Sequence, residues 1–182
     1  MNFDLAKKLS FKRSDFSGCP AWKMPFMILA IGFGTGLLPA SGTAATLLGA
    51  PIVLAMPWLG LNSIWSQVIA CLALTLLAIP LCDLAESHYR RKDDGRIVAD
   101  EYLTFPIVML GLPHAPIVFV VAFLTNRFFD IVKPPPANQL QAIKGGLGIV
   151  IDDFIACLFS LLTNHAILYF MGPFLRQKGW LP

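Results

Sequence analysis

The chain has 182 residues, of which 56% are hydrophobic and 14% are charged, and its mean hydropathy is +0.67. A soluble domain usually has about a quarter of its residues charged, so a membrane suits this composition better than water. The net charge of +3 is small and dispersed, which argues against a nucleic-acid partner. The length predicts one folded domain. The four cysteines fit neither a disulfide framework nor a zinc motif, so we expect all four to be reduced.

The N-terminal segment 1–22 mixes apolar residues with Lys7, Lys8, Lys12 and Arg13. It lacks the unbroken apolar core of a secretory signal. The pattern is typical of a basic amphipathic segment on a membrane surface, and a disordered tail is the alternative. We therefore expect this segment to precede a membrane domain over residues 23–182.

The first apolar region, Met24–Leu61, is interrupted by the glycine-rich stretch GFGTGLLPASGTAATLLGAP at 32–51. Non-helical backbone is tolerated at membrane depth only where protein or a watery cavity covers it. We expect either a re-entrant turn or a tight packing surface of small residues. Backbone N–H groups of the same stretch could also cradle a phosphate.

Three further apolar tracts follow. Leu61–Cys82 carries no charge before its end and is long enough to cross about 30 Å of hydrocarbon. Leu103–Asn126 is broken by the glycine and prolines of 111–116, which favours a short helical hairpin over one straight span. Gly148–Phe170 is a second candidate span. The sequence therefore predicts an all-α, multi-helical integral membrane protein with broken or re-entrant segments.

Positive charge is distributed unevenly between the loops. The loops at 58–62 and 111–116 contain neither lysine nor arginine. The basic residues follow the first clear span and the hairpin instead: Arg90, Arg91, Lys92, Arg96, Arg127, Lys133 and Lys144. By the positive-inside rule, the basic loops and the N-terminus face the cytoplasm.

Seven of the eleven carboxylates fall in three segments at the predicted cytoplasmic ends of the apolar tracts: 93–101, 127–136 and 144–153. Charged residues at the end of a membrane helix often do no more than interact with water and headgroups at the membrane interface. Carboxylates that run into apolar sequence are costlier, and they are candidates for function. The three segments therefore predict one acidic site.

Asp152 and Asp153 lie in the first turns of the last tract. Neighbours on a helix point about 100° apart, so the two carboxylates cannot both face lipid comfortably. Together they could bind one Mg²⁺, or one could hold the metal and the other a water. The alternative is stabilisation of a helix N-terminus by acidic residues.

Asp130 follows Arg127 by three residues, so both side chains can point from one helix face. Pro134 disfavours helical backbone at Lys133 and predicts the helix end there, and the proline run 134–136 predicts a stiff extended exit. A carboxylate and two cations then lie within reach of one ligand. Hard carboxylate oxygens suit Mg²⁺, and Arg127 and Lys133 would neutralise a phosphate. An isolated Arg–Asp ion pair is the alternative.

Four motifs, in this order, resemble the phosphatidylglycerophosphatase A family: GFGTGLLPASGT, IVADE, RFFDIVKPPP and GGLGIVIDD. The resemblance runs from about Pro25 to Phe170. It departs from the family at Ser41, Thr104 and Val150, and at Ala156-Cys157. None of these departures removes a carboxylate or a cation.

The resemblance implies a membrane-embedded, Mg²⁺-dependent phosphatase of phospholipid biosynthesis, in the bacterial cytoplasmic (inner) membrane with its site facing the cytoplasm. Its substrate would be the phospholipid phosphatidylglycerophosphate, and its products phosphatidylglycerol and phosphate. The resemblance also implies metal-binding and catalytic roles for one set of residues: Asp100, Glu101, Asp130, Asp152 and Asp153. It implies phosphate binding for a second set: Gly42, Thr43, Arg127 and Lys133.

Three rival functions remain open at this level. One is a phosphatase for another phosphorylated lipid or a soluble phosphomonoester. Another is an ion-binding or transport protein, since buried carboxylates also mark ion pathways. The third is a catalytically inactive scaffold for lipid synthesis. The sequence leaves the oligomeric state and the identity of the catalytic base open.

Overall fold

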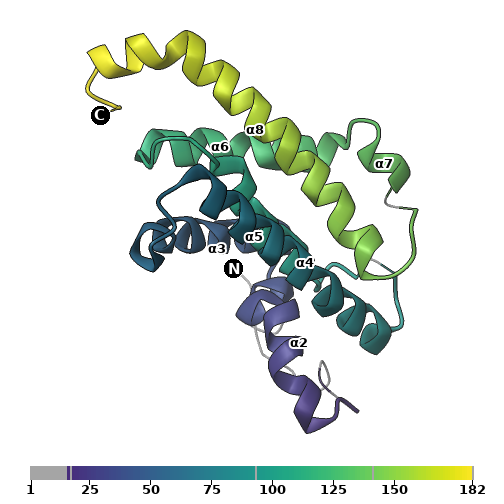
Figure 1. Ribbon diagram of the computed structural model, residues 1–182. Helices are drawn as coiled ribbons and strands as arrows, with labels where there is room; N and C mark the ends of the chain where they lie inside the picture. Colours follow the sequence, from purple (N-terminus) through teal and green to yellow (C-terminus); the bar gives the residue numbers. More distant parts are fainter. Residues whose placement is uncertain (1–15, 17, 93, 141, 182) are drawn as a thin grey trace, which may run out of the picture.

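The computed structural model describes residue 16 and residues 18–92, 94–140 and 142–181. Every regular element in this part of the chain is helical, which confirms the predicted all-α class (Figure 1). The predicted basic segment 1–22 lies mostly outside the described residues, so its boundary with the membrane domain stays a prediction. The elements with α-helical geometry are α2 (Met24–Ala30), α3 (Ser41–Ala55), α4 (Ile64–Tyr89), α5 (Ala99–Thr104), α6 (Pro116–Val132), α7 (Ala137–Leu140) and α8 (Gly146–Gln177). Short 3-10 segments are η2 (Ala21–Lys23), η3 (Gly32–Leu37), η4 (Pro57–Leu59) and η5 (Phe105–Met109).

Two helices, α4 and α8, are long and apolar enough to cross a membrane. Helix α4 begins three residues after the predicted start of the span Leu61–Cys82 and continues to Tyr89, and α8 contains the span Gly148–Phe170 and continues to Gln177. The apolar residues of α4 are widely exposed, including Trp65 at 75% and Leu76 at 65%. Side chains of this kind avoid water, so the exposed face of α4 suits contact with lipid.

The glycine-rich stretch breaks the first apolar region, as predicted. Backbone with positive φ at Phe33, Gly34 and Ala40 separates α2 from α3, because no regular helix continues through that conformation. The glycines of α3 also allow close packing. A Cβ atom at Gly49 would lie 2.5 Å from the Cβ of Phe105. Tight packing by small residues is therefore observed in this region.

The hairpin prediction is also confirmed. Segment η5 and helix α6 are separated by irregular backbone at 110–115. Helix α6 ends at Val132, and Lys133 caps it in a left-handed conformation with φ 46°. The expected extended exit after it is wrong, however. The prolines 134–136 form a turn that leads directly into α7, because the left-handed Lys133 reverses the chain before the proline run begins.

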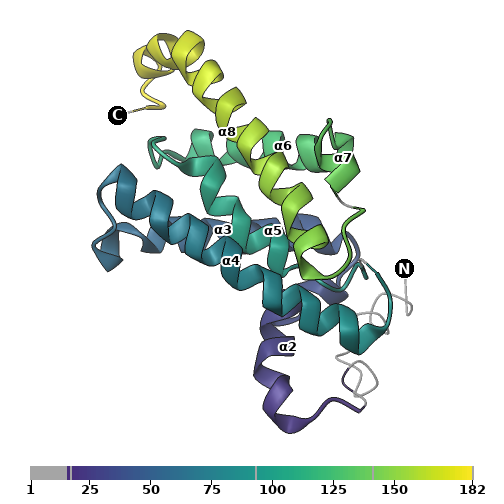
Figure 2. The same ribbon diagram turned by 45° about the vertical axis from the view of Figure 1, so that its right-hand side comes forward.

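The arrangement places the short α5 at the centre of the bundle. It packs against α3, α4 and α8, and α8 also contacts α6 and η5. Figures 1 and 2 both show α8 crossing the bundle beside α6, whereas α2 projects from the opposite side. The N-terminal turns of α3, α5 and α8 and the C-terminal turn of α6 supply the polar motifs, so their packing decides whether one site forms.

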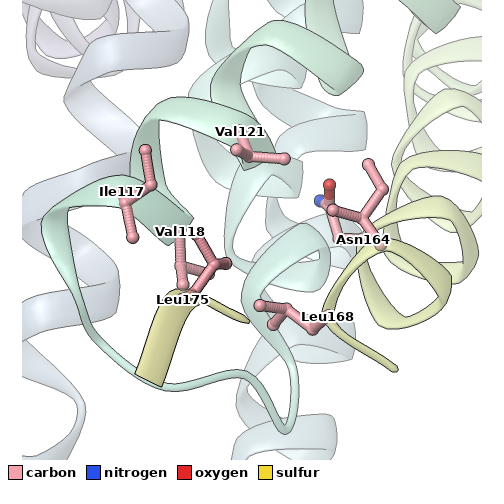
Figure 3. A pocket seen from close by; sticks show the side chains of 7 residues that line it. Ile117, Val118, Val121, Asn164, Leu168 and Leu175 are labelled. Atoms are coloured by element: carbon pink, nitrogen blue, oxygen red, sulfur yellow. The ribbon is translucent and has the colours of Figure 1, made fainter. Parts of the chain in front are cut away.

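Helices α6 and α8 also pack against each other in the bundle. Figure 3 shows Asn164 of α8 among the apolar side chains of this contact, which together line a cavity of about 20 Å³. Thr125 donates a hydrogen bond to the Asn164 Oδ1 at 3.0 Å, which links the two helices. A buried polar link of this kind fixes the register of two apolar helices. All four cysteines are free, as expected.

The close approach of α3 to Phe105 predicts a specific loss of stability. Gly49→Ala places a methyl group against the Phe105 side chain and should destabilise the fold by about 1–3 kcal/mol through overpacking. Gly172→Ala is the matched control, because a Cβ atom at this second helical glycine meets nothing within 4 Å. Thermal unfolding of both variants in detergent checks this. Equal melting temperatures would contradict the packing described for α3.

Candidate active site

The ends of α3, α5, α6 and α8 meet at one place and bring most of the predicted residues together. Asp100 and Glu101 come from the first turn of α5, and Arg127 and Asp130 from the last turns of α6. Helix α8 contributes Asp152 and Asp153, and Lys133 caps α6. Carboxylates up to 53 positions apart in the chain therefore share one acidic site.

Arg127 joins three of the four helices. Its Nη1 donates to the Glu101 Oε2 at 2.5 Å and to the Thr46 Oγ1 at 3.0 Å. Its Nη2 lies 2.8 Å from the Asp130 Oδ2. The predicted Arg127–Asp130 pair is thus confirmed, but it is not isolated. A planar guanidinium can hold several acceptors in fixed directions, which suits it to this position.

Lys133 forms the second ion pair of the site. Its Nζ donates to the Asp152 Oδ2 at 2.6 Å. Partial burial acts to lower the pKa of the Lys133 ammonium, but the hydrogen bond to Asp152 and the negative charges of Asp152, Asp130 and Asp153 together outweigh burial and raise that pKa above its usual value. Lys133 is therefore a cation at neutral pH. The pair ties the end of α6 to the first turns of α8.

Asp153 lies at the centre of the negative charge. Its side chain is buried, and it interacts electrostatically with four other carboxylates: Asp100, Glu101, Asp130 and Asp152. Five carboxylates thus face the two cations Arg127 and Lys133. If all are charged, three negative charges are left over. Such an excess is costly in a poorly solvated place unless a cation or protons compensate it.

Neutral polar side chains lie next to the charged side chains of the site. Cys157, one turn after Asp153 on α8, donates to the Asn126 Oδ1 at 3.3 Å, and its Sγ lies 3.5 Å from the Thr104 Oγ1. Thr104 donates to the Asp100 carbonyl at 2.6 Å. The sequence analysis did not predict Asn126 as a site residue. Its polar side chain at the end of an apolar tract, next to Arg127, could have indicated it.

The start of α3 closes the site on another side. Gly42 packs directly against the Glu101 carboxylate, where a Cβ atom would collide with both carboxylate oxygens. Thr43, by contrast, is exposed, and among the described residues no hydrogen bond or ion pair joins it to the cluster. Thr46, which the sequence analysis missed, is fully buried and lies 3.2 Å from the Glu101 Oε2. Thr46 lies about one helical turn after Thr43, the threonine of the predicted motif.

Asp94 belongs to the predicted acidic segment but has a separate partner. Arg96 donates to the Asp94 Oδ1 at 2.8 Å and stacks on the Tyr89 ring, 3.7 Å from its centroid. Ser41 donates to the neighbouring Gly95 carbonyl at 2.7 Å, which ties this loop to the start of α3. The hydrogen bond from Arg96 lowers the pKa of the Asp94 carboxyl.

The donor set fits a magnesium ion in its chemistry. All five candidate ligands offer hard oxygen atoms, which Mg²⁺ prefers, and their excess charge is negative. In the described part of the chain, no three His, Cys, Asp or Glu side chains are already grouped as metal ligands. Arg127 and Lys133 hold Glu101, Asp130 and Asp152 as ion pairs instead.

Comparisons with known proteins identify the family of the chain. The sequence profile of "Phosphatidylglycerophosphatase A" matches residues 28–168. The chain belongs to the phosphatidylglycerophosphatase A family. This membership makes it a phosphatase that acts on phosphoric monoesters, implies a lipid substrate and associates it with the membrane.

Two relatives carry the family's name. The phosphatidylglycerophosphatase A of Haemophilus influenzae is 35% identical over 81% of this chain and 91% of its own length. That of Escherichia coli is 33% identical over 81% of this chain and 84% of its own length. A provisionally named phosphatidylinositol-3-phosphatase from Bacteroides thetaiotaomicron is 31% identical over 80% of this chain and 95% of its own length. No solved structure matches the chain.

The Asp94 ion pair predicts how stability depends on pH. Because the folded pKa of Asp94 is depressed, its contribution is present above the unfolded value of about 3.9 and is lost as pH falls through the folded pKa. Asp94→Asn should lower the melting temperature by roughly 2–10 °C at pH 7, a loss of about 1–3 kcal/mol. The difference from the unmodified protein should shrink as the pH falls below about 4. Melting curves at several pH values check both effects, and a difference that grows in acid would contradict the assignment.

Proposed function

We propose that this protein hydrolyses phosphatidylglycerophosphate to phosphatidylglycerol and inorganic phosphate, with Mg²⁺, as a step of phospholipid biosynthesis. The observation that carries the proposal is the partly buried cluster of five carboxylates and two cations at the ends of apolar helices. The names of the Haemophilus influenzae and Escherichia coli relatives supply the substrate.

Arg127 and Lys133 are suited to bind the phosphate. Among the described residues, nothing accepts a hydrogen bond from the buried Nε of Arg127. A buried donor without an acceptor is costly, so a phosphate oxygen would stabilise the folded site as well as the ligand. The Lys133 ammonium lies at the same helix end and neutralises further charge. Gly42 leaves room for the Glu101 carboxylate beside this place.

The five carboxylates have two tasks in this proposal. Those that hold Mg²⁺ come from the set Asp100, Glu101, Asp130, Asp152 and Asp153. When bound, the ion would neutralise phosphate charge and help to orient a water for in-line attack. A carboxylate of the same set accepts a proton from that water as its oxygen attacks phosphorus. The P–O bond to the glycerol breaks, and the leaving oxygen takes up a proton to give phosphatidylglycerol.

The position of the site suits a lipid substrate. Helices α3, α6 and α8 carry exposed apolar side chains that hydrocarbon would cover, including Leu124 and Leu162. The charged cluster lies at one end of these helices. Acyl chains can therefore stay in the bilayer while the phosphomonoester reaches Arg127 at the interface. A soluble phosphomonoester needs no such surroundings.

The same end of the bundle carries the basic loops. Lys92 donates to the Ala142 carbonyl at 3.2 Å, which joins the loop after α4 to the loop before α8. The loops at the other end, 58–62 and 111–116, contain no lysine or arginine. The positive-inside rule then supports a site that faces the cytoplasm from the bacterial inner membrane.

Asp153 gives the sharpest test of the catalytic cluster. Asp153→Asn keeps the shape but removes negative charge from its centre, so it should lower kcat by about 100-fold or more. Its melting temperature should hold or rise, because repulsion among the carboxylates is relieved. Glu86→Gln is the control, since Glu86 is a carboxylate of α4 outside the cluster. Phosphate release and melting curves are measured for both. Normal turnover in Asp153→Asn would place the chemistry elsewhere.

The Bacteroides thetaiotaomicron relative motivates a second candidate substrate. Phosphatidylglycerophosphate should be cleaved with a higher kcat/KM than phosphatidylinositol 3-phosphate, phosphatidic acid or glycerol phosphate. The physical reason is that the two cations bind any phosphomonoester, so preference must come from the rest of the lipid. Phosphate release from each, presented in the same mixed micelles, checks this order. A preference for the inositol lipid would move the protein to the second candidate.

A further inference from the structure

An apolar groove lies between α3 and α6. It begins beside the charged cluster and extends away from it. Leu47 and Ala50 of α3 line one side, and Val120, Phe123 and Leu124 of α6 line the other. The groove has a volume of about 180 Å³. It is separate from the cavity at Asn164, which lies on the opposite side of α6, against α8.

The groove begins where the charged cluster ends. Thr46, a residue of the groove wall, accepts a hydrogen bond from the Arg127 Nη1 at 3.0 Å and contacts Glu101. On the facing helix, Leu124 precedes Arg127 by one turn. Helices α3 and α6 therefore both run from the charged cluster into the apolar groove, with the polar Thr46 of α3 and the charged Arg127 of α6 at the cluster end.

The rim of the groove is open. Leu47 is 56% exposed, Val120 53% and Leu124 60%, although each is a large apolar residue. Three such residues around one groove would be unfavourable in water but are favourable in hydrocarbon. An open rim of this kind suits the acyl region of a bilayer, while Thr46 in the groove wall is hydrogen-bonded to Arg127 of the cluster.

We propose that this groove holds one acyl chain of the phosphorylated lipid substrate while Arg127 binds the phosphate. The inference rests on the proposed lipid phosphatase function and assigns a place to the substrate's tail. Hydrocarbon gains little by moving from lipid to an apolar groove, so the benefit is positional. A chain held along α3 and α6 fixes the depth and direction of the headgroup, which raises the fraction of bound lipid that is ready to react.

Photolabelling tests the occupant directly. The probe is a non-hydrolysable phosphonate analogue of phosphatidylglycerophosphate with a diazirine on one acyl chain, in phosphatidylcholine vesicles that contain the full-length protein. Peptide mass spectrometry should find adducts concentrated at 47–50 and 119–124. The same photolipid without its phosphonate should label these residues several-fold less. Adducts spread equally over the exposed face of α4 at Leu72 and Leu76, or a groove shielded by a second copy or another protein, would overturn the proposal.

Filling the groove provides the matched variant. Ala50→Trp should abolish the groove adducts and lower kcat/KM for the long-chain substrate by about 10-fold or more, because the headgroup loses its alignment. Leu124→Trp, at the open rim, is the second variant if Ala50→Trp does not fold, as judged by its melting curve. Leu72→Trp, on the exposed face of α4, is the control and should change neither quantity. Unchanged labelling and kinetics in both groove variants would contradict the assignment.

The outcomes separate this inference from the proposed function. Labelling does not require turnover, so the groove can be tested even if phosphate release fails. A wild-type protein that releases no phosphate from phosphatidylglycerophosphate would sink the proposed activity. An active wild-type protein with no adducts in the groove would sink only the acyl-chain site.

Discussion

The structure depends on the way Arg127 holds helices α3, α5 and α6 together beside α8. Its guanidinium contacts Thr46, Glu101 and Asp130, and it interacts electrostatically with Asp153. Without this cation, carboxylates from three helices would face one another in a place with little water to screen them. The repulsion would oppose the close packing that the small residues of α3 allow. The ion pairs thus make it possible for helix ends rich in carboxylates to meet.

Under the proposed function, that arrangement lets one site serve both folding and catalysis. Arg127 and Lys133 offset part of the negative charge but not all of it, and the remaining excess favours the binding of a divalent cation. A phosphate group restores the balance for the arginine and the lysine at the same time. Under the proposed function, charge that is costly in the protein alone would become favourable when metal and substrate are both bound. The neutral layer of Thr104, Asn126 and Cys157 separates this charge from the apolar interior.

Much of this could be predicted from the sequence, and the reasons for the rest are physical. Apolar length predicted α4 and α8, and proline and glycine predicted the breaks before α3 and α6. Acidic residues at tract ends predicted the cluster, because charge is rare where lipid surrounds the chain. The turn at 134–136 was missed because it depends on the left-handed backbone of Lys133. Thr46 and Asn126 were missed because a single polar residue in an apolar helix shows no partner until packing places one beside it. Asp94 was grouped with the cluster by position, but its short bond to Arg96 depends on the turn of that loop.

Under the proposed function, a divalent cation balances the uncompensated negative charge of this site during phosphate release. The most direct measurement is phosphate release from phosphatidylglycerophosphate by the purified protein, followed as Mg²⁺ is titrated into excess chelator. The account predicts no turnover in chelator and a saturable recovery with Mg²⁺, greater than the recovery with Zn²⁺, because the ligands are hard carboxylate oxygens. Full turnover in excess chelator would contradict it.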